Sequence, residues 1–174
     1  LGMGGVLGAD FLAWHTVDVD PAAGEVRLTD ALPDVSGLIA VPVERFSAGL
    51  LKLTVTVAGE PVVAMLDLGA DVSVLSWKAA NLAGLTYGQG ERDGLLMGAD
   101  GRSVSLFAAP IPLAVGDLDL GTPRVSMANL DALQRHFGDG PSVLLGQDLL
   151  RDRRVVIDYA CLLYTSPSPR DNRV

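Results

Sequence analysis

The feature that most constrains the fold is a sequence pattern that occurs twice, near the two ends of the 174-residue chain. Leu-Gly-x-Asp-apolar-Leu at 7–12 is followed by apolar-x-apolar-Asp at 17–20, and both patterns return at 145–150 and 155–158. All seven matched positions keep the same offset of 138, from position 7 to position 145. A repeat with such a long period indicates two copies of one structural unit.

The repeat predicts that only the end of the first copy is present. Copy one continues into a further strand after Asp20, whereas copy two breaks into Ser-Pro-Ser-Pro after Cys161. The residues from Cys161 onward resemble translated sequencing-adapter read-through, with a native proline-rich tail as the alternative. The expected segments are the C-terminal tail of an upstream unit (1–30), a linker with one edge strand (31–48), a complete unit (49–160) and a non-native tail (161–174).

Composition favours a β-rich protein and excludes several functions. Half of the residues are apolar, and 20 glycines and 10 prolines provide many turns. The net charge of −8 argues against nucleic-acid or anionic-membrane partners. The single cysteine excludes an internal disulfide and a cysteine-based zinc cluster, and we expect no cofactor or metal. The longest charge-free stretch, 103–116, is too short for a membrane span. Localisation stays open; the periplasm or secretion would require a signal before Leu1.

Alternating apolar residues predict strands through most of the complete unit. Residues 51–57 alternate, a Gly-Glu turn follows, and 61–66 return as a buried strand that leads through a loop to a short strand at 72–75. The remaining expected elements are a helix at 77–83, hairpins pairing 94–97 with 102–106 and 111–115 with 118–125, and a helix at 129–137. The pattern is that of an all-β fold with one or two short helices.

Four polar residues are expected to cap helices, because each precedes or opens a short helical segment. Ser76 and Asn129 stand at the starts of the two helices of the complete unit. Asp10 and Asp148 occupy the same position in the two copies of the repeat, each at the start of a predicted short helix. Capping is therefore the expected role of both aspartates.

The stretch from Ala64 to Ser73 carries the residue with the clearest chemical interest. A run of strand formers delivers Asp67 into a tight Gly-Ala turn, and a second apolar run leaves it. A carboxylate between apolar segments is held by hydrogen bonds, by a partner charge or by a shared proton, and such carboxylates are often catalytic. The alternative is a turn aspartate that caps its own loop.

Three features together resemble the retropepsin-like aspartic proteases, in particular bacterial-type domains with two units in tandem. They are the Asp67-x-Gly69-Ala70-x-x-Ser73 loop, the hairpin with Asp100-Gly101 at its tip, and the apolar-Leu-Gly-x-Asp-x-Leu segment at 144–150. The resemblance covers 49–160 and the tail of a preceding unit. It implies an all-β, retropepsin-like acid-protease barrel.

The resemblance implies a role for each motif. Asp67 is the catalytic aspartate, and a second retropepsin-like unit, either an upstream copy in the chain or a homodimer partner, supplies the other half of the dyad. The dyad holds the water that hydrolyses a peptide bond of a peptide or protein substrate. The residues implied to bind substrate belong to the same loop and to the flap hairpin: Gly69, Ala70, Asp71, Met97, Gly98, Ala99, Asp100 and Gly101.

Two departures from the family pattern leave a second function open. Leu68 stands where the family has a threonine or serine whose hydroxyl bonds across the dyad, and leucine can neither donate nor accept a hydrogen bond. Gln147 replaces an arginine of the retroviral members that could pair with Asp71. The two hypotheses are an aspartic endopeptidase and a catalytically impaired module that keeps the fold for peptide binding or dimerisation.

Overall fold

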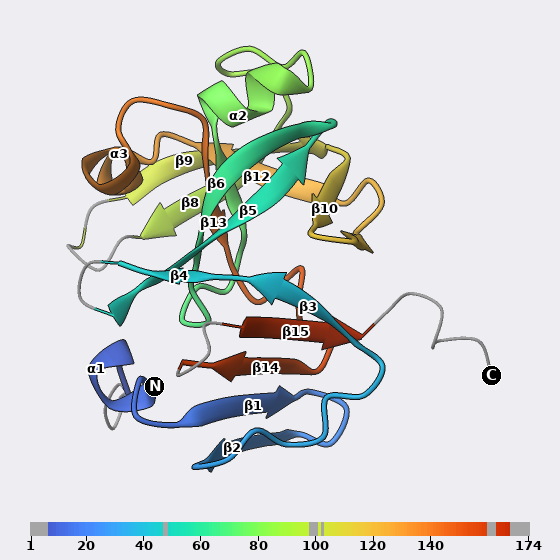
Figure 1. Ribbon diagram of the computed structural model, residues 1–174. Helices are drawn as coiled ribbons and strands as arrows, with labels where there is room; N and C mark the ends of the chain where they lie inside the picture. The colour runs from blue at the N-terminus through green and yellow to red at the C-terminus, as the bar shows by residue number, and fades with distance from the viewer. Residues whose placement is uncertain (1–6, 47–48, 98–100, 102, 160–162, 168–174) are drawn as a thin grey trace.

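The computed structural model describes residues 7–46, 49–97, 101, 103–159 and 163–167, which form two sheets and three short helices (Figure 1). In spatial order, the ten-stranded sheet consists of β11 (Leu118–Asp119), β10 (Leu113–Val115), β5 (Leu51–Val57), β6 (Glu60–Leu66), β13 (Ser142–Leu145), β7 (Val74–Ser76), β12 (Arg124–Ala128), β9 (Ser103–Pro110) and β8 (Glu91–Met97), with β4 (Glu44–Arg45) paired to β5. The five-stranded sheet has the order β2 (Glu25–Thr29), β1 (Thr16–Asp20), β14 (Val155–Asp158), β15 (Leu163–Pro167) and β3 (Leu38–Pro42). The helices are α1 (Ala9–Leu12), α2 (Trp77–Leu82) and α3 (Asp131–Phe137).

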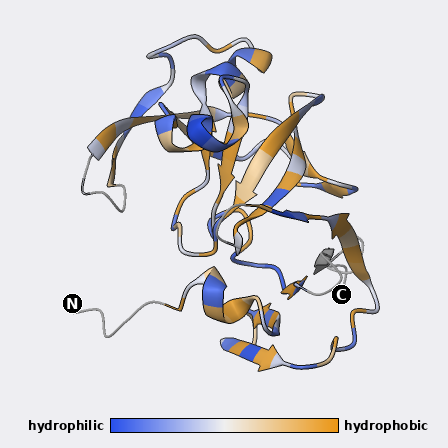
Figure 2. Ribbon diagram, turned by 60° about the vertical axis from the view of Figure 1, so that its left-hand side comes forward, coloured by the Kyte–Doolittle hydropathy of each residue, from blue (hydrophilic) through white to orange (hydrophobic). Residues whose placement is uncertain are grey.

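The ten-stranded sheet folds where the sequence alternates. Every second residue of β5 is buried, and β6 returns antiparallel to it from Glu60 to Leu66. Figure 2 shows hydrophobic and hydrophilic residues mixed along the strands and helices of this part of the molecule. The apolar alternation therefore fixes which face of each strand enters the core.

Two strands that are far apart in sequence position the loop after β6. β13 pairs parallel to β6, with Leu145 opposite Leu66, and antiparallel to β7. The loop that contains Asp67 thus leaves the sheet between β6 and β7 and extends toward the five-stranded sheet (Figure 1).

Most of the expected elements are present, including the 51–66 hairpin and the edge strand in the linker, which is β3. The Ser76 hydroxyl accepts a hydrogen bond from the Ala79 N–H at 3.2 Å and caps α2 as expected. No helix in the described ranges is long and apolar enough to cross a membrane.

Three predictions of local structure were wrong. The expected strand 118–125 is split, because the chain turns at Gly121, whose N–H donates to Asp119, before β12 begins beside β9. Asn129 does not cap α3. The N-cap is Leu130, whose buried side chain belongs to an apolar cluster with Leu133 and so fixes the start of the helix.

The third error concerns the two aspartates of the repeat. Asp10 lies inside α1, whose N-cap is Gly8 and has no side-chain capping bond. Asp148 lies in a turn and not at a helix start, and its carboxylate binds a residue of a distant loop. Neither aspartate is a helix cap.

The last described strand falls within the expected non-native tail. The backbone of β15 pairs with β14 on one side and with β3 on the other. Whether this segment is native remains a prediction from the sequence.

Candidate active site

The Asp67 loop is a tight turn closed by backbone hydrogen bonds. The Asp67 N–H donates to the Leu145 carbonyl at 3.0 Å, which attaches the start of the loop to β13. The Ala70 N–H donates to the Asp67 carbonyl at 3.1 Å, and the Gly69 N–H donates to Asp67 Oδ1 at 2.9 Å. One oxygen of the half-buried carboxylate is therefore held by the backbone of its own loop.

A buried serine and a half-buried aspartate fix the far end of the loop. The Ser73 N–H and hydroxyl donate to Asp148 Oδ1 at 2.8 and 2.5 Å, and the Leu149 N–H donates to the same oxygen at 2.9 Å. The Ser73 hydroxyl oxygen also accepts from the Gly146 N–H at 2.9 Å. Hydrogen bonds to a charged group are stronger than neutral ones, so this contact determines where the loop ends.

The segment after β13 approaches the loop so closely that only glycine fits at its centre. A Cβ atom on Gly146 would stand 2.7 Å from the backbone of Val72 and 2.8 Å from the Ala70 carbonyl. Next to this contact, the Gln147 N–H donates to the Ala70 carbonyl at 2.9 Å. The Gln147 side-chain amide donates to the Leu68 carbonyl. The loop is thus held along its whole length by 145–149.

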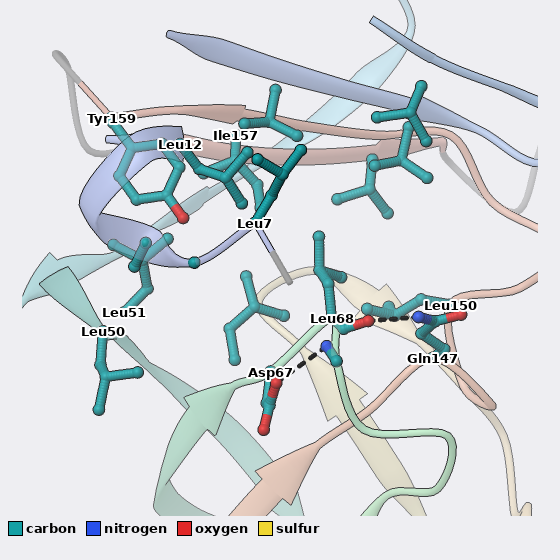
Figure 3. A pocket seen from close by; sticks show the side chains of 18 of the residues that line it. Leu7, Leu12, Leu50, Leu51, Asp67, Leu68, Gln147, Leu150, Ile157 and Tyr159 are labelled. Carbon is teal, nitrogen blue, oxygen red and sulfur yellow. Dashed lines mark hydrogen bonds between the residues drawn. The ribbon is translucent and has the colours of Figure 1, made fainter. Parts of the chain in front are cut away.

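A largely apolar cavity of about 580 Å³ lies between the Asp67 loop and the five-stranded sheet. Its lining includes Asp67, Leu68 and Gly69 from the loop, and Leu7 and Ile157 from the opposite side. Figure 3 shows the Leu68 side chain pointing from the loop into this space, while the Asp67 carboxylate points the other way. The position that the family fills with a hydroxyl here presents an apolar side chain to an apolar space.

One polar side chain of the cavity lining, Tyr159, has a shifted pKa. Burial raises the pKa of the Tyr159 phenol, and the nearby Arg45 guanidinium, 5.6 Å from the centre of its ring, opposes that shift. The phenol is therefore neutral over the physiological range. No group of three or more His, Cys, Asp or Glu side chains in the described ranges could hold a metal ion.

The structure brings together some of the expected site residues. Gly69, Ala70 and Asp71 lie beside Asp67 in its loop, with Gly69 and Asp71 exposed. Met97, 73% exposed, ends β8, and Gly101 lies in the turn before β9; neither lines the cavity. The expected flap residues Gly98, Ala99 and Asp100 lie outside the described residues.

The sequence analysis did not identify the structural roles of Ser73, Gly146 and Asp148. Their partners are 73 to 75 positions away along the chain, so local patterns do not reveal the contacts. The signal available was the repeat itself, because Gly and Asp recur at the same two positions in both copies.

Comparison with known proteins agrees with this geometry. A family model described as "Aspartyl protease" matches residues 53–149, more than half of the chain. The chain belongs to this aspartyl protease family. The match spans the Asp67 loop and the 145–149 segment that holds it.

Two solved structures are similar to this chain. A retropepsin-like aspartic protease from Rickettsia conorii is 20% identical, with 75% of this chain and 91% of that chain covered and a TM-score of 0.55. EIAV protease in complex with the inhibitor HBY-793 is 27% identical over 58% of this chain and 85% of its own, with a TM-score of 0.42. No curated protein matches. The mainly β, retropepsin-like fold expected from the sequence is confirmed.

Proposed function

We propose that this protein is an aspartic endopeptidase in which Asp67 is one half of a catalytic dyad. The observation that carries this proposal is the Asp67 loop, which borders a cavity and bonds one oxygen of its half-buried carboxylate to the Gly69 N–H. The hydrogen bond from the Ser73 hydroxyl to the Asp148 carboxylate keeps the loop in place. Such preorganisation is what a group that positions a reacting water requires.

The chemistry needs a second carboxylate that shares one proton with Asp67. The ionised carboxylate removes a proton from water as the water oxygen bonds to the peptide carbonyl carbon, and the protonated carboxyl gives its proton to the carbonyl oxygen. The carboxyl that took the proton from water then gives it to the nitrogen as the carbon–nitrogen bond breaks, and the other carboxylate takes a proton back from a hydroxyl of the intermediate, which leaves a carboxylic acid, an amine and the original dyad. The two pKa values of such a dyad belong to the pair.

The arrangement of the five-stranded sheet supports an upstream unit, rather than a homodimer, as the source of the second aspartate. β14 follows the segment that holds the Asp67 loop, and β1 pairs with one of its edges. A second copy of β14 could not pair at the edge that β1 occupies. The strand already beside β14 is β1, the expected end of an upstream unit.

In this proposal the substrate lies over the Asp67 loop and under the hairpin of β8 and β9. Gly69, Ala70 and Asp71 would contact the peptide backbone, and Met97 to Gly101 would cover it. Exclusion of bulk water by such a cover strengthens every polar contact at the reacting bond.

One observation favours the alternative, a module that binds peptides without cleaving them. Leu68 packs against the core and has no hydroxyl with which to tie the two halves of a dyad together. A lost hydrogen bond of this kind is worth about 0.5–1.5 kcal/mol, which would slow the chemistry without unfolding the protein.

The deciding experiment compares the longer protein, with its upstream unit, and its Asp67→Asn variant. We expect pepstatin-sensitive cleavage of a peptide library at acid pH by the parent protein and none by the variant. Asp117→Asn, which changes an exposed turn aspartate, is the matched control and keeps activity. Equal cleavage by the parent and Asp67→Asn would show that Asp67 is not the catalyst.

A further inference from the structure

The hairpin of β8 and β9 contains an irregularity at the strand that forms the end of the sheet. β8 is the last strand in the order of the ten-stranded sheet and pairs with β9 (Figure 1). Its register shifts between Arg92 and Gly94, so Asp93 is an extra residue with no register partner on β9. A bulge of this kind bends a strand and re-aims a side chain. Asp93 thus stands where the direction of the hairpin is set.

The Asp93 carboxylate reaches across β9 to the strand beyond it. The Ser126 hydroxyl on β12 donates to Asp93 Oδ2 at 2.8 Å, and Arg124 Nη2 donates to Asp93 Oδ1 at 3.2 Å. The other terminal nitrogen of Arg124, Nη1, donates to Glu91 Oε2 at 2.6 Å. We call these four residues the hairpin bridge, because they connect the bulge of β8 directly to β12.

The strand between the two ends of the bridge carries a small side chain at the crossing point. Ala108 of β9 is paired with Glu91 on one side and with Ser126 on the other. Paired residues of neighbouring strands project from the same face of a sheet, and the two outer strands are roughly 10 Å apart, so the bridge runs over that face. A methyl group at position 108 leaves room for it.

Glycines before and after the bulge allow the chain to follow this course. A Cβ atom on Gly90 would stand 2.8 Å from the Ala108 carbonyl oxygen, so the start of β8 lies against β9 more closely than a side chain permits. Gly94, directly after Asp93, has a φ of 110°, which other residues rarely adopt. The bend at Asp93 is therefore built into the backbone, and the bridge holds it from outside.

The bridge favours the ionised form of Asp93. The hydrogen bond from Ser126, the hydrogen bond from Arg124 and the charge of Arg124 hold the pKa of Asp93 below its ordinary value, against the opposing effect of partial burial. The carboxylate therefore keeps its charge in mildly acidic solution, where a dyad of two carboxyl groups holds its shared proton.

The side chains of the bridge are too exposed to be needed for folding. The Arg124 and Asp93 side chains are 47% and 35% exposed, and that of Glu91 is 80% exposed. Ion pairs in such positions contribute little to the free energy of unfolding. They can still select one orientation of a weakly held strand. β8 is such a strand, since all its residues are exposed except Leu96, which packs against an apolar cluster.

We propose that the hairpin bridge fixes the direction in which the β8–β9 hairpin extends over a bound peptide, and that Asp93 and Arg124 are positioning residues for substrate binding. The hairpin contacts the peptide, and the bridge acts through the placement of the hairpin. No hydrogen bond or ion pair among the described residues links the bridge to the Asp67 loop. The inference rests on the proposed function, because it concerns the hairpin that covers the substrate there.

The first test measures peptide cleavage by the longer protein and by its Asp93→Asn, Arg124→Gln and double variants. A hairpin that samples other directions binds the peptide less well in the ground state and the transition state alike, so we expect KM to rise about three- to tenfold while kcat stays within about twofold. Loss of folded protein would instead lower the apparent kcat and leave KM unchanged. Because both side chains act through one bridge, we expect the KM of the double variant to stay within about twofold of that of Arg124→Gln.

The second test reads the hairpin without any activity. Amide protons of 94–97 and 103–106 are expected to exchange faster in Arg124→Gln than in the parent protein, while those of β5 and β6 keep their protection. Lys52→Gln is the matched control in both tests, because it breaks an ion pair of the same sheet, 2.8 Å to Glu44, that lies outside the hairpin. It should change neither KM nor the exchange of the hairpin.

The outcomes separate the bridge from the proposed function. Unchanged exchange of the hairpin in Arg124→Gln, or faster exchange with an unchanged KM, would overturn the bridge as a positioning device. Effects on KM that multiply in the double variant would also overturn it, because the two side chains would then act separately. In each case, loss of cleavage in Asp67→Asn leaves the proposed function standing. Full activity of Asp67→Asn would overturn the proposed function itself, and the exchange measurement would still decide whether the bridge holds the hairpin.

Discussion

The two sheets of this protein are built in different ways. The ten-stranded sheet takes all its strands from one continuous stretch, 44–145, and its core residues are almost all apolar. The five-stranded sheet combines strands from both ends of the chain, and a buried charge lies at its centre. The first sheet is thus self-contained, whereas the second joins segments from the two ends of the chain, and we call it the joint. Substitutions in the two sheets should therefore act differently.

Two aspartates of the five-stranded sheet are buried, and Asp18, which is 1% exposed, is more deeply buried than Asp158, which is 5% exposed. Arg154 binds Asp18 through Nε at 2.9 Å and through Nη2 at 3.0 Å, and Arg27 approaches to 3.3 Å. The hydrogen bond from Arg154 and the two nearby positive charges hold the pKa of Asp18 below its ordinary value, against the opposing effect of burial. The match of Asp18 in the repeat is the apolar Val156, so the ion pair exists once and makes the joint asymmetric.

The largest expected effect comes from Arg154→Leu. This substitution leaves the Asp18 carboxylate buried with only the longer contact to Arg27, and loss of one partner of a buried pair costs about 3–5 kcal/mol. We expect amide protons of β1 and β2 to exchange much faster, while β5, β6 and β13 keep their protection.

Arg151→Leu is the control for this exchange measurement. The Arg151 side chain is exposed, and no hydrogen bond or ion pair to it is found within the described residues. Equal loss of protection in both sheets of Arg154→Leu would contradict the view that the five-stranded sheet is a separable joint.

The next largest effect is expected from Gly146→Ala, in the ten-stranded sheet. The added methyl group would meet the backbone of Ala70 and Val72, which cannot move aside as a flexible side chain would. Overpacking of this kind costs about 1–3 kcal/mol, and here it separates the Asp67 loop from β13. Urea denaturation should show a lower free energy of unfolding for the whole protein.

Gly140→Ala provides a matched comparison, because a Cβ atom there meets no atom within 4 Å. Its unfolding free energy should stay near that of the parent. A similar loss in both variants would mean that the close approach at Gly146 is not what holds the loop.

Acid should weaken the joint through Asp18. Because the folded pKa of Asp18 is below its ordinary value, the unfolded chain binds the proton at a higher pH than the folded one. The stabilisation by Asp18 is therefore complete above the ordinary aspartate pKa and is lost as the pH falls through the lowered folded value. Urea denaturation between pH 5 and pH 2 measures this loss, and Asp18→Asn should flatten the curve. An unchanged slope in that variant would assign the acid sensitivity to other carboxylates.

Local patterns predicted the parts of this fold that depend on neighbouring residues. The β5–β6 hairpin and the Ser76 cap follow from alternation and from a hydroxyl at a helix start, and both are present. The start of α3 could not be predicted this way, because burial of Leu130 and not the polarity of Asn129 sets it. Packing between distant segments decides such boundaries.

The same distinction between local patterns and contacts of distant segments applies to the candidate site. The sequence located Asp67 because a carboxylate between two apolar runs is unusual, and the structure places it beside a cavity. The role of Asp148 stayed hidden because its partner, Ser73, is 75 positions away. Only the fold brings the two together.

The smallest effect on stability, and the most informative one on activity, is expected from Leu68→Thr in the longer protein. Leu68 belongs to the ten-stranded unit but faces the joint, so it is the residue where the two regions meet. Loss of its partly buried apolar surface costs about 1 kcal/mol. A hydroxyl that ties the two loops together contributes about 0.5–1.5 kcal/mol, which corresponds to a roughly two- to twelvefold rise in kcat. Leu68→Val has nearly the shape of threonine without the hydroxyl and separates the two effects. If the threonine and valine variants cleave a peptide equally fast, the hydroxyl has no role here, and the apolar side chain at position 68 is compatible with the full activity of the protein.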